Sequence, residues 1–210
     1  MCPVSCRNSG STARTAWNSL RMCSPMKQRY SRHVEPRGAL DVARHYVREL
    51  IYGANDGIIT TFAVVAGVAG GGLPLRVVLI IGAANLLADG LSMAVGNYLA
   101  IQSHESVLES QGLPQEEASP RRHAAATFLA FVLAGAVPLV PYMIPGLTLN
   151  RFAVSIVLTL LALFGVGASR ALIANVRWLK AGLEMLVLGA IVAALAYGSG
   201  ALVAAVVGGA

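Results

Sequence analysis

The chain has 210 residues, of which 56% are hydrophobic and 12% are charged, and its mean hydropathy is +0.65. A soluble domain carries roughly 25% charged residues, so this composition excludes a soluble core of ordinary size and indicates a membrane protein. The net charge of +6 follows the tail and the loops, so it indicates membrane topology and not a nucleic-acid partner.

Residues 1–37 form an N-terminal tail that we expect to be disordered, or to begin too early, with Met22 or Met26 as the true initiator. The many Arg and Ser residues of this tail also resemble the composition of a transit peptide. The tail contains three cysteines, Cys2, Cys6 and Cys23. On the cytoplasmic side of a membrane they are expected to stay reduced.

Residues 38–50 follow a helical pattern. Leu40, Ala43, Val47 and Leu50 recur at helical spacing, while the charged side chains lie mostly on the other side. We expect a basic amphipathic helix that lies on the cytoplasmic surface and leads into the first span. A simple extension of that span explains the pattern equally well.

Apolar stretches long enough to cross a bilayer occupy most of the remaining chain, since a span needs roughly 20 helical residues. The predicted spans are about Ile51–Gly70, Val77–Ile101, Ala124–Ile144, Phe152–Ile173 and Ala181–Gly208. They are rich in Ala, Gly and Ser, which let helices approach closely in lipid. We therefore predict an all-α integral membrane protein with five transmembrane helices over residues 51–208.

The basic residues predict the orientation of these spans. Most of the 16 Lys and Arg residues fall on one side of the predicted bundle, and only Arg76 and Arg151 fall on the other. Because basic residues collect on the cytoplasmic side, we expect a cytoplasmic N-terminus and a C-terminus across the membrane. The stretch GGGLPLR predicts a short turn between the first two spans. Three prolines, Pro138, Pro141 and Pro145, are expected to kink or end the third span.

A hydrophilic loop at 102–123 holds acidic residues and two histidines. Glu105 and Glu109 are four residues apart, so they share a face if the second span continues as a helix into the cytoplasm. Carboxylates near imidazoles can bind divalent cations, which makes Glu105 and Glu109 candidate metal ligands. The alternative is a solvated loop whose acids balance Arg121 and Arg122.

Three carboxylates lie within or at the edge of the predicted spans: Asp56, Asp89 and Glu184. At about 1.5 Å per residue, Asp56 lies roughly 7–8 Å from the cytoplasmic end of its span, and Asp89 lies roughly 18 Å deep. Glu184 is also close to the cytoplasmic end. A charge near the middle of a bilayer is costly, so it is usually retained for a task.

Asp89 belongs to a column of polar side chains and one thioether. Asn85, Asp89, Met93 and Asn97 follow one another at four-residue steps along one side of the second span. A cation that crosses lipid must replace its water shell with such groups, and a thioether favours transition metals such as Fe²⁺ or Mn²⁺. The alternatives are packing for Met93 and interhelical hydrogen bonds for the asparagines.

Three stretches of the sequence carry a family resemblance. They read YGANDGIITTFAVVAGVAGG at 52–71, ANLLADGLSMAVGNYLAIQS at 84–103 and GLEMLVLGA at 182–190. From about Arg48 to Val207 the chain resembles the vacuolar iron transporter family, which includes yeast vacuolar iron and manganese transporters and plant nodulin-like members.

The resemblance implies a five-span subunit, a homodimer with the metal path at its interface, and proton-coupled export of Fe²⁺ or Mn²⁺ from the cytosol. The implied membrane is a bacterial inner membrane or an organellar, vacuolar-type membrane. By position, Asp56 and Met93 match residues that line the family's path. Plant iron-storing members carry a glutamate where this chain has Asn85. They also carry a long helical metal-binding domain where this chain has the loop at 102–123.

The sequence therefore predicts a divalent-metal transporter and not an enzyme, with metal ions and protons as substrates and no cofactor. The predicted ligands are Asp56, Asp89 and Met93 first, then Asn85, Asn97 and Glu184, with Glu105 and Glu109 in the loop. One rival is an intramembrane aspartyl hydrolase, although Asp56 and Asp89 are estimated to differ in depth by roughly 10 Å. The other is a membrane scaffold without transport, which leaves Asp89 unexplained.

Overall fold

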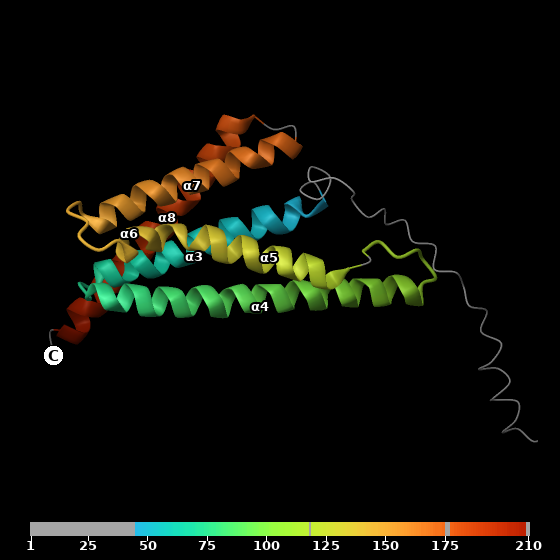
Figure 1. Ribbon diagram of the computed structural model, residues 1–210, viewed down its shortest axis with the longest axis horizontal. Helices are drawn as coiled ribbons and strands as arrows, with labels where there is room; N and C mark the ends of the chain where they lie inside the picture. The colour runs from blue at the N-terminus through green and yellow to red at the C-terminus, as the bar shows by residue number, and fades with distance from the viewer. Residues whose placement is uncertain (1–44, 118, 175–176, 209–210) are drawn as a thin grey trace, which may run out of the picture.

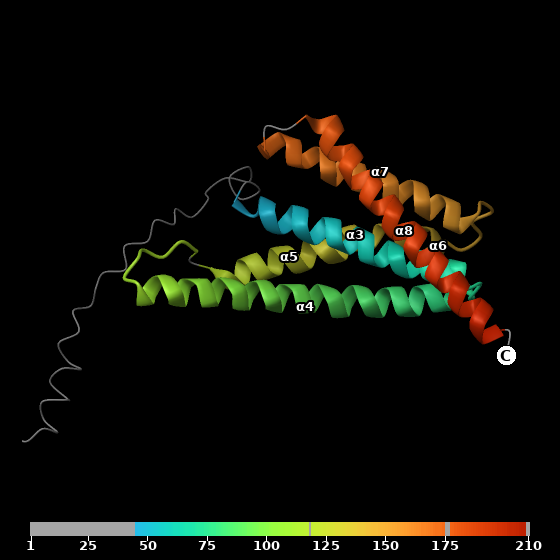
Figure 2. The ribbon, with the colours of Figure 1, turned by 180° about the vertical axis from the view of Figure 1, so that it is seen from behind.

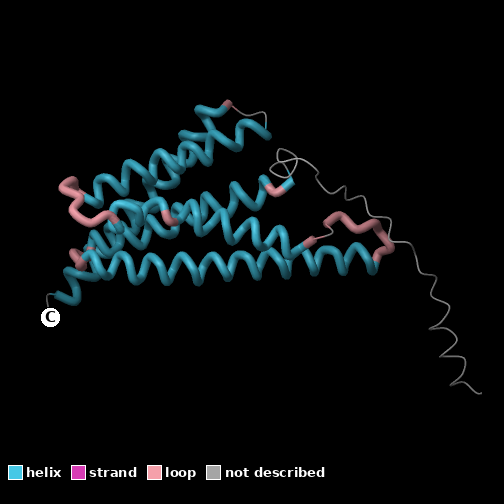
Figure 3. Tube along the Cα trace, viewed as in Figure 1, coloured by secondary structure: helices cyan, strands magenta, loops and turns pink. Residues whose placement is uncertain are grey.

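The computed structural model describes residues 45–117, 119–174 and 177–208 (Figure 1). These residues form helices joined by short loops, and no strand occurs among them (Figure 3). The predicted all-α class is therefore confirmed. The predicted tail at 1–37 and most of the predicted amphipathic helix at 38–50 lie outside the described residues.

Five helices in the described part of the chain are long and apolar enough to cross a membrane. The bounds are α3 (Val47–Gly70), α4 (Leu75–Ser110), α5 (Pro120–Gly135), the 3-10 turn η1 (Val137–Leu139), α6 (Val140–Met143), α7 (Arg151–Ala174) and α8 (Trp178–Gly208). The third span comprises α5, η1 and α6, because it is interrupted where the prolines begin. All five predicted spans are thus present as helices.

Helix α3 is the centre of the bundle, since it packs against α4, α5, α7 and α8. Helix α4 runs along one side of the bundle and α7 along the opposite side, while α8 crosses α3 obliquely (Figure 2). The first span is therefore the element from which a side chain can reach most of its neighbours.

Glycines on α3 let the neighbouring backbones come close. A Cβ added at Gly53 would lie 2.7 Å from the carbonyl oxygen of Thr127, and one at Gly57 would meet the carbonyl oxygen of Phe131. On the other side of α3, a Cβ at Gly70 would meet the carbonyl of Tyr197. The prediction that small residues serve a tightly packed bundle is confirmed at these positions.

The turns follow the glycines and prolines of the sequence. The α3–α4 turn contains Gly72 with a φ of +64°, which favours glycine. Helix α5 ends at Gly135, and the Ser155 hydroxyl donates a 2.7 Å hydrogen bond to the carbonyl of Pro138 where the helix is interrupted. The expected break in the third span is confirmed.

Helix α4 is longer than the predicted second span. Its 36 residues correspond to about 54 Å, well beyond a hydrocarbon core of about 30 Å. Residues 102–110 continue the helix, so the link between the end of α4 and the start of α5 spans only positions 111–119. We call the end of the bundle that carries this connection the link end.

The link end gathers one end of every span. Helices α3, α5 and α8 begin there, and α4 and α7 end there. Six basic residues belong to these segments: Arg48, Arg121, Arg122, Arg170, Arg177 and Lys180. By contrast, Arg76 and Arg151 belong to helix starts at the opposite end. The basic residues separate as predicted, and the assignment of the link end to the cytoplasm stays a prediction.

Candidate functional site

The predicted column on α4 lies at the border between the buried and exposed sides of that helix. All four of its members, Asn85, Asp89, Met93 and Asn97, are half-buried. The adjacent Leu87 and Leu91 are exposed, whereas Leu86 and Gly90 are buried. The structure therefore aligns the four side chains on one stripe that borders both the bundle and the outer face of α4.

Asp56 faces this column from α3. Its side chain is half-buried, and the carboxylate of Asp89 on α4 lies close enough for the two charges to interact. Two like charges that approach each other within a membrane span are costly unless a cation or a proton lies with them. The two carboxylates come from different spans, and the sequence alone does not show that these spans bring them near each other.

The backbone around Asp56 is held firmly. Gly53 and Gly57 bring α5 against α3, and the Thr60 hydroxyl donates a 2.8 Å hydrogen bond to the carbonyl of Asp56. The neighbouring Asn55 has a buried Oδ1 that makes no hydrogen bond with any described residue. This packing fixes the backbone of α3 around Asp56 against α5.

Asn97 has a structural partner. Its side-chain amide donates a 2.9 Å hydrogen bond to the hydroxyl of Thr127 on α5. The alternative of an interhelical hydrogen bond is therefore confirmed for Asn97, and its role as a metal ligand stays a prediction.

Glu184 is not brought to the column. It is exposed in the first turns of α8, and this part of α8 lies beside α7, on the opposite side of the bundle from α4 (Figures 1 and 2). Glu184 thus lies apart from the column on α4, and its role as a metal ligand remains a prediction.

The acidic residues near the end of α4 have different surroundings. One oxygen of Glu105 accepts hydrogen bonds from the backbone N–H groups of Glu116, at 3.1 Å, and Glu117, at 2.7 Å. Glu109 lies exposed in the last turn of α4. Because α4 continues through both residues, they do share a helix face. Glu105 also holds the link in place, and metal binding by either residue stays a prediction.

A cluster at the link end was not among the predicted ligands. His123 Nδ1 lies 3.1 Å from Glu49 Oε1, and His123 Nε2 lies 2.9 Å from Glu117 Oε2. His45 Nε2 lies 3.7 Å from the same oxygen of Glu117. One sequence signal was present: His45 and Glu49 are four residues apart, a spacing that places two side chains on one side of a helix.

The fold defines a multi-pass membrane protein, and two of its intramembrane carboxylates, Asp56 and Asp89, lie on its first two spans. The profile of the VIT family matches residues 47–112 and 106–201, which together cover most of the chain. The chain belongs to the VIT family.

Curated relatives agree with this assignment. Vacuolar iron transporter 1 of Eucalyptus grandis is 27% identical over an alignment of 213 positions, gaps included. The alignment covers 74% of this chain and 86% of the relative. Vacuolar iron transporter homolog 3 of Arabidopsis thaliana is 28% identical over an alignment of 165 positions, which covers 73% of this chain and 80% of the relative. The vacuolar iron transporter of Toxoplasma gondii is 39% identical over 71 residues, covering 34% and 24%.

The two longer alignments differ in one respect. They cover nearly the same share of this chain, yet the alignment with the Eucalyptus protein extends over more positions. That relative therefore carries a stretch without a counterpart here. The two matched segments of the family profile meet at 106–112, at the end of α4. Both observations agree with the short α4–α5 link of this chain.

Proposed function

We propose that this protein transports divalent transition-metal ions, Fe²⁺ or Mn²⁺, out of the cytosol in exchange for protons. The membrane would be an organellar, vacuolar-type membrane or a bacterial inner membrane. The observation that carries the proposal is the approach of Asp56 on α3 to Asp89 on α4. The names of the relatives, which are iron transporters, support metal as the substrate.

The proposed ligands can replace the water shell of an ion. Two carboxylates supply charge, Met93 lies one helical turn beyond Asp89 toward the link end, and Asn85 lies one turn in the other direction. Carboxylate oxygens alone also suit Mg²⁺ and Ca²⁺. The thioether of Met93 shifts the preference toward transition metals.

Exchange with protons follows from the same carboxylates. A carboxyl group in a membrane span is stable when it holds a proton or a metal ion, and it is costly when it holds neither. A site that alternates between these two states moves protons in one direction and metal in the other. In this proposal Asp56 is nearer to the link end and receives the metal first.

A homodimer would complete the site. Leu87, Leu91 and Val95 are exposed on the outer face of α4, directly beside the column. A second copy packed across this face by a two-fold axis would present each ligand twice. The path would then lie between the two α4 helices, enclosed by protein instead of lipid.

Metal flux into proteoliposomes tests the transport proposal. Full-length protein is reconstituted with a trapped metal-sensitive dye, and uptake of Fe²⁺ and Mn²⁺ is measured with and without a pH gradient. We expect Asp56→Asn and Asp89→Asn to abolish uptake with the fold intact, because an amide cannot carry the charge or exchange a proton. Glu116→Gln, the same change from carboxylate to amide on the exposed α4–α5 link, is the matched control and should retain uptake. Normal flux through correctly inserted Asp89→Asn would overturn the assignment.

Cross-linking tests the proposed dimer. The native cysteines are replaced by serine, and single cysteines are introduced at Ser92 on α4 or at Leu195 on α8, both of which are exposed. We expect a disulfide-linked dimer in membranes from Ser92→Cys alone. Efficient linkage through position 195 and none through position 92 would place the interface on the other side of the subunit.

A further inference from the structure

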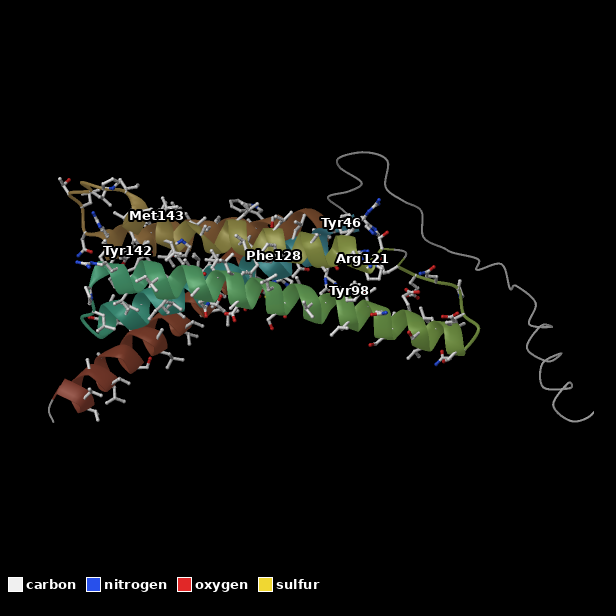
Figure 4. All side chains as sticks on the ribbon, turned by 60° about the horizontal axis from the view of Figure 1, so that its bottom comes forward. Tyr46, Tyr98, Arg121, Phe128, Tyr142 and Met143 are labelled. Atoms are coloured by element: carbon white, nitrogen blue, oxygen red, sulfur yellow. The ribbon has the colours of Figure 1, made fainter. Side chains whose placement is uncertain are left out.

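A second cluster of chemically active side chains lies at the link end, apart from the Asp56 and Asp89 pair. His45 precedes α3, Glu49 is in its first turn, Glu117 is in the link and His123 is in the first turn of α5. Figure 4 shows this end of the bundle, with Tyr46 before α3 and Arg121 at the start of α5 labelled, and the rings of Tyr46 and His123 have centroids 4.7 Å apart. Three separate segments of the chain therefore meet in this cluster.

Distances within the cluster suit a single ion. One ligand atom from each of His45, Glu117 and His123 can be chosen so that all three lie within 4.8 Å of one another. Bonds of about 2.0–2.2 Å to nitrogen and oxygen ligands allow two ligand atoms of one ion to be at most about 4.4 Å apart. A shift of a few tenths of an ångström, well within the freedom of these side chains, would bring the three atoms around one centre.

Glu49 orients the most deeply buried member of the cluster. The side chains of His123 and Glu49 are only 3% and 5% exposed, and His123 Nδ1 lies 3.1 Å from Glu49 Oε1. A carboxylate beside Nδ1 favours the tautomer that carries its proton there, which leaves the lone pair on Nε2. Metal-binding histidines commonly have this arrangement, with one nitrogen on the ion and the other facing a carboxylate.

The buried nitrogens of His123 need a partner. Neither ring nitrogen makes a hydrogen bond within the described part of the chain, although each faces a carboxylate oxygen. Buried polar atoms are almost always satisfied by protein, by water or by an ion. The side chains beside it are partly exposed, His45 at 20% and Glu117 at 34%. The cluster therefore lies next to the surface, with its ligand atoms buried behind the partly exposed side chains of His45 and Glu117.

We propose that His45, Glu117 and His123 bind one divalent transition-metal ion, with Glu49 as the residue that positions the His123 ring. Two imidazoles and one carboxylate form a ligand set that suits Fe²⁺, Co²⁺ or Zn²⁺ and disfavours Mg²⁺ and Ca²⁺, which prefer oxygen ligands alone. The bound ion joins the start of α3 to the α4–α5 link and to the start of α5.

The site is distinct from the proposed transport path. Glu49 and Asp56 are seven residues apart on α3, which corresponds to about 10 Å. If the proposed transport function holds, an ion bound at the link end lies about two helical turns outside Asp56. Binding itself can be measured in protein that does not transport, so the two proposals can fail separately.

Titration with Co²⁺ alone tests the site in the full-length, detergent-solubilised protein. The background carries Asp56→Asn and Asp89→Asn, which removes the carboxylates of the path. We expect one Co²⁺ per chain with the visible absorption of a nitrogen and oxygen site, and a rise in the thermal unfolding midpoint on binding. His45→Ala and His123→Ala should each weaken binding by more than about tenfold, and Glu49→Gln by about 10–100-fold.

His104→Ala is the matched control. His104 is exposed and lies 3.3 Å from Glu116, so it provides an imidazole next to a carboxylate without burial. We expect this variant to bind Co²⁺ as the background does. If His123→Ala does not fold, His45→Ala decides, since its side chain lies at the edge of the cluster. No Co²⁺ binding in the background, or equal affinity in His45→Ala and His104→Ala, would reduce the cluster to an ion-pair network and overturn the proposal.

Discussion

The side-chain amide of Asn97 donates a 2.9 Å hydrogen bond to the hydroxyl of Thr127, and this contact joins α4 to α5. Thr127 donates in turn to the carbonyl of His123 at 3.0 Å. The nitrogen of Asn97 is thus engaged in holding two spans together. Spacing alone placed Asn97 in the column of candidate metal ligands, but in the structure its side chain holds two helices together. Any contact of Asn97 with an ion would have to use its side-chain carbonyl oxygen.

Thr127→Val should therefore lower stability without stopping transport. The substitution keeps the shape of the side chain and removes the hydrogen bond, which is worth about 0.6 kcal/mol on average between membrane helices. We expect a small drop in the thermal unfolding midpoint and unchanged metal uptake. Ser106→Ala is the control, because Ser106 bonds only within α4. Loss of uptake with unchanged stability would assign the Asn97–Thr127 pair to the metal path instead.

Gly57→Ala should disrupt the packing of α3 on α5. A methyl group at this position meets the backbone carbonyl of Phe131, which cannot move aside as a flexible side chain could. We expect a loss of about 1–3 kcal/mol in the free energy of unfolding, as in other overpacked cores. The shift should also displace Asp56 and reduce metal uptake.

Gly165→Ala, on α7, is the matched control for that change. A Cβ at Gly165 has no other atom within 4 Å among the described residues. Alanine is also a better helix former than glycine by about 1 kcal/mol, so stability should be unchanged or slightly higher. Equal destabilisation by the two substitutions would show that the close approach of α3 and α5 is not the cause.

The spans and their turns were predictable because their signals are local. A run of apolar residues must be helical in lipid, since every backbone group has to be satisfied within the segment. Glycines before Pro74 and the three prolines of the third span marked the turns correctly. The end of α4 at Ser110 was not predicted, because residues 102–110 are mostly polar and carry no signal of a span, although they continue the same helix.

The site was predictable only in part. Asn85, Asp89, Met93 and Asn97 lie on one helix, so spacing alone placed them on one stripe. The approach of Asp56 to Asp89 depends on how α3 packs on α4, which no local pattern specifies. The cluster of His45, Glu117 and His123 requires the link to fold back between two helix starts. Its position is set by long-range contacts, such as the hydrogen bonds of the link to Glu105.

Glu105→Ala should loosen the link, whereas Glu109→Ala should not. The Glu105 carboxylate accepts two backbone hydrogen bonds from the link, and bonds to charged groups are worth about 1.5–3 kcal/mol each. We expect faster hydrogen–deuterium exchange at Glu116 and Glu117 in Glu105→Ala alone. Both variants remove one carboxylate, so at low ionic strength both should weaken the apparent affinity for metal more than the maximal rate. Exchange rates that do not differ between the variants would remove the structural role of Glu105.

Met93→Leu should change metal preference more than stability. Leucine fills nearly the same volume as methionine, so the packing around the half-buried side chain at position 93 should be largely retained. The substitution removes the thioether, which is a soft ligand and matters more for Fe²⁺ than for the harder Mn²⁺. We expect Fe²⁺ uptake into proteoliposomes to fall by about tenfold, with a smaller loss for Mn²⁺. Met143→Leu, the same substitution at an exposed residue of the opposite end (Figure 4), is the control and should leave both fluxes unchanged. If Met93→Leu leaves both fluxes unchanged, or lowers them by the same factor, Met93 is a packing residue and not a ligand.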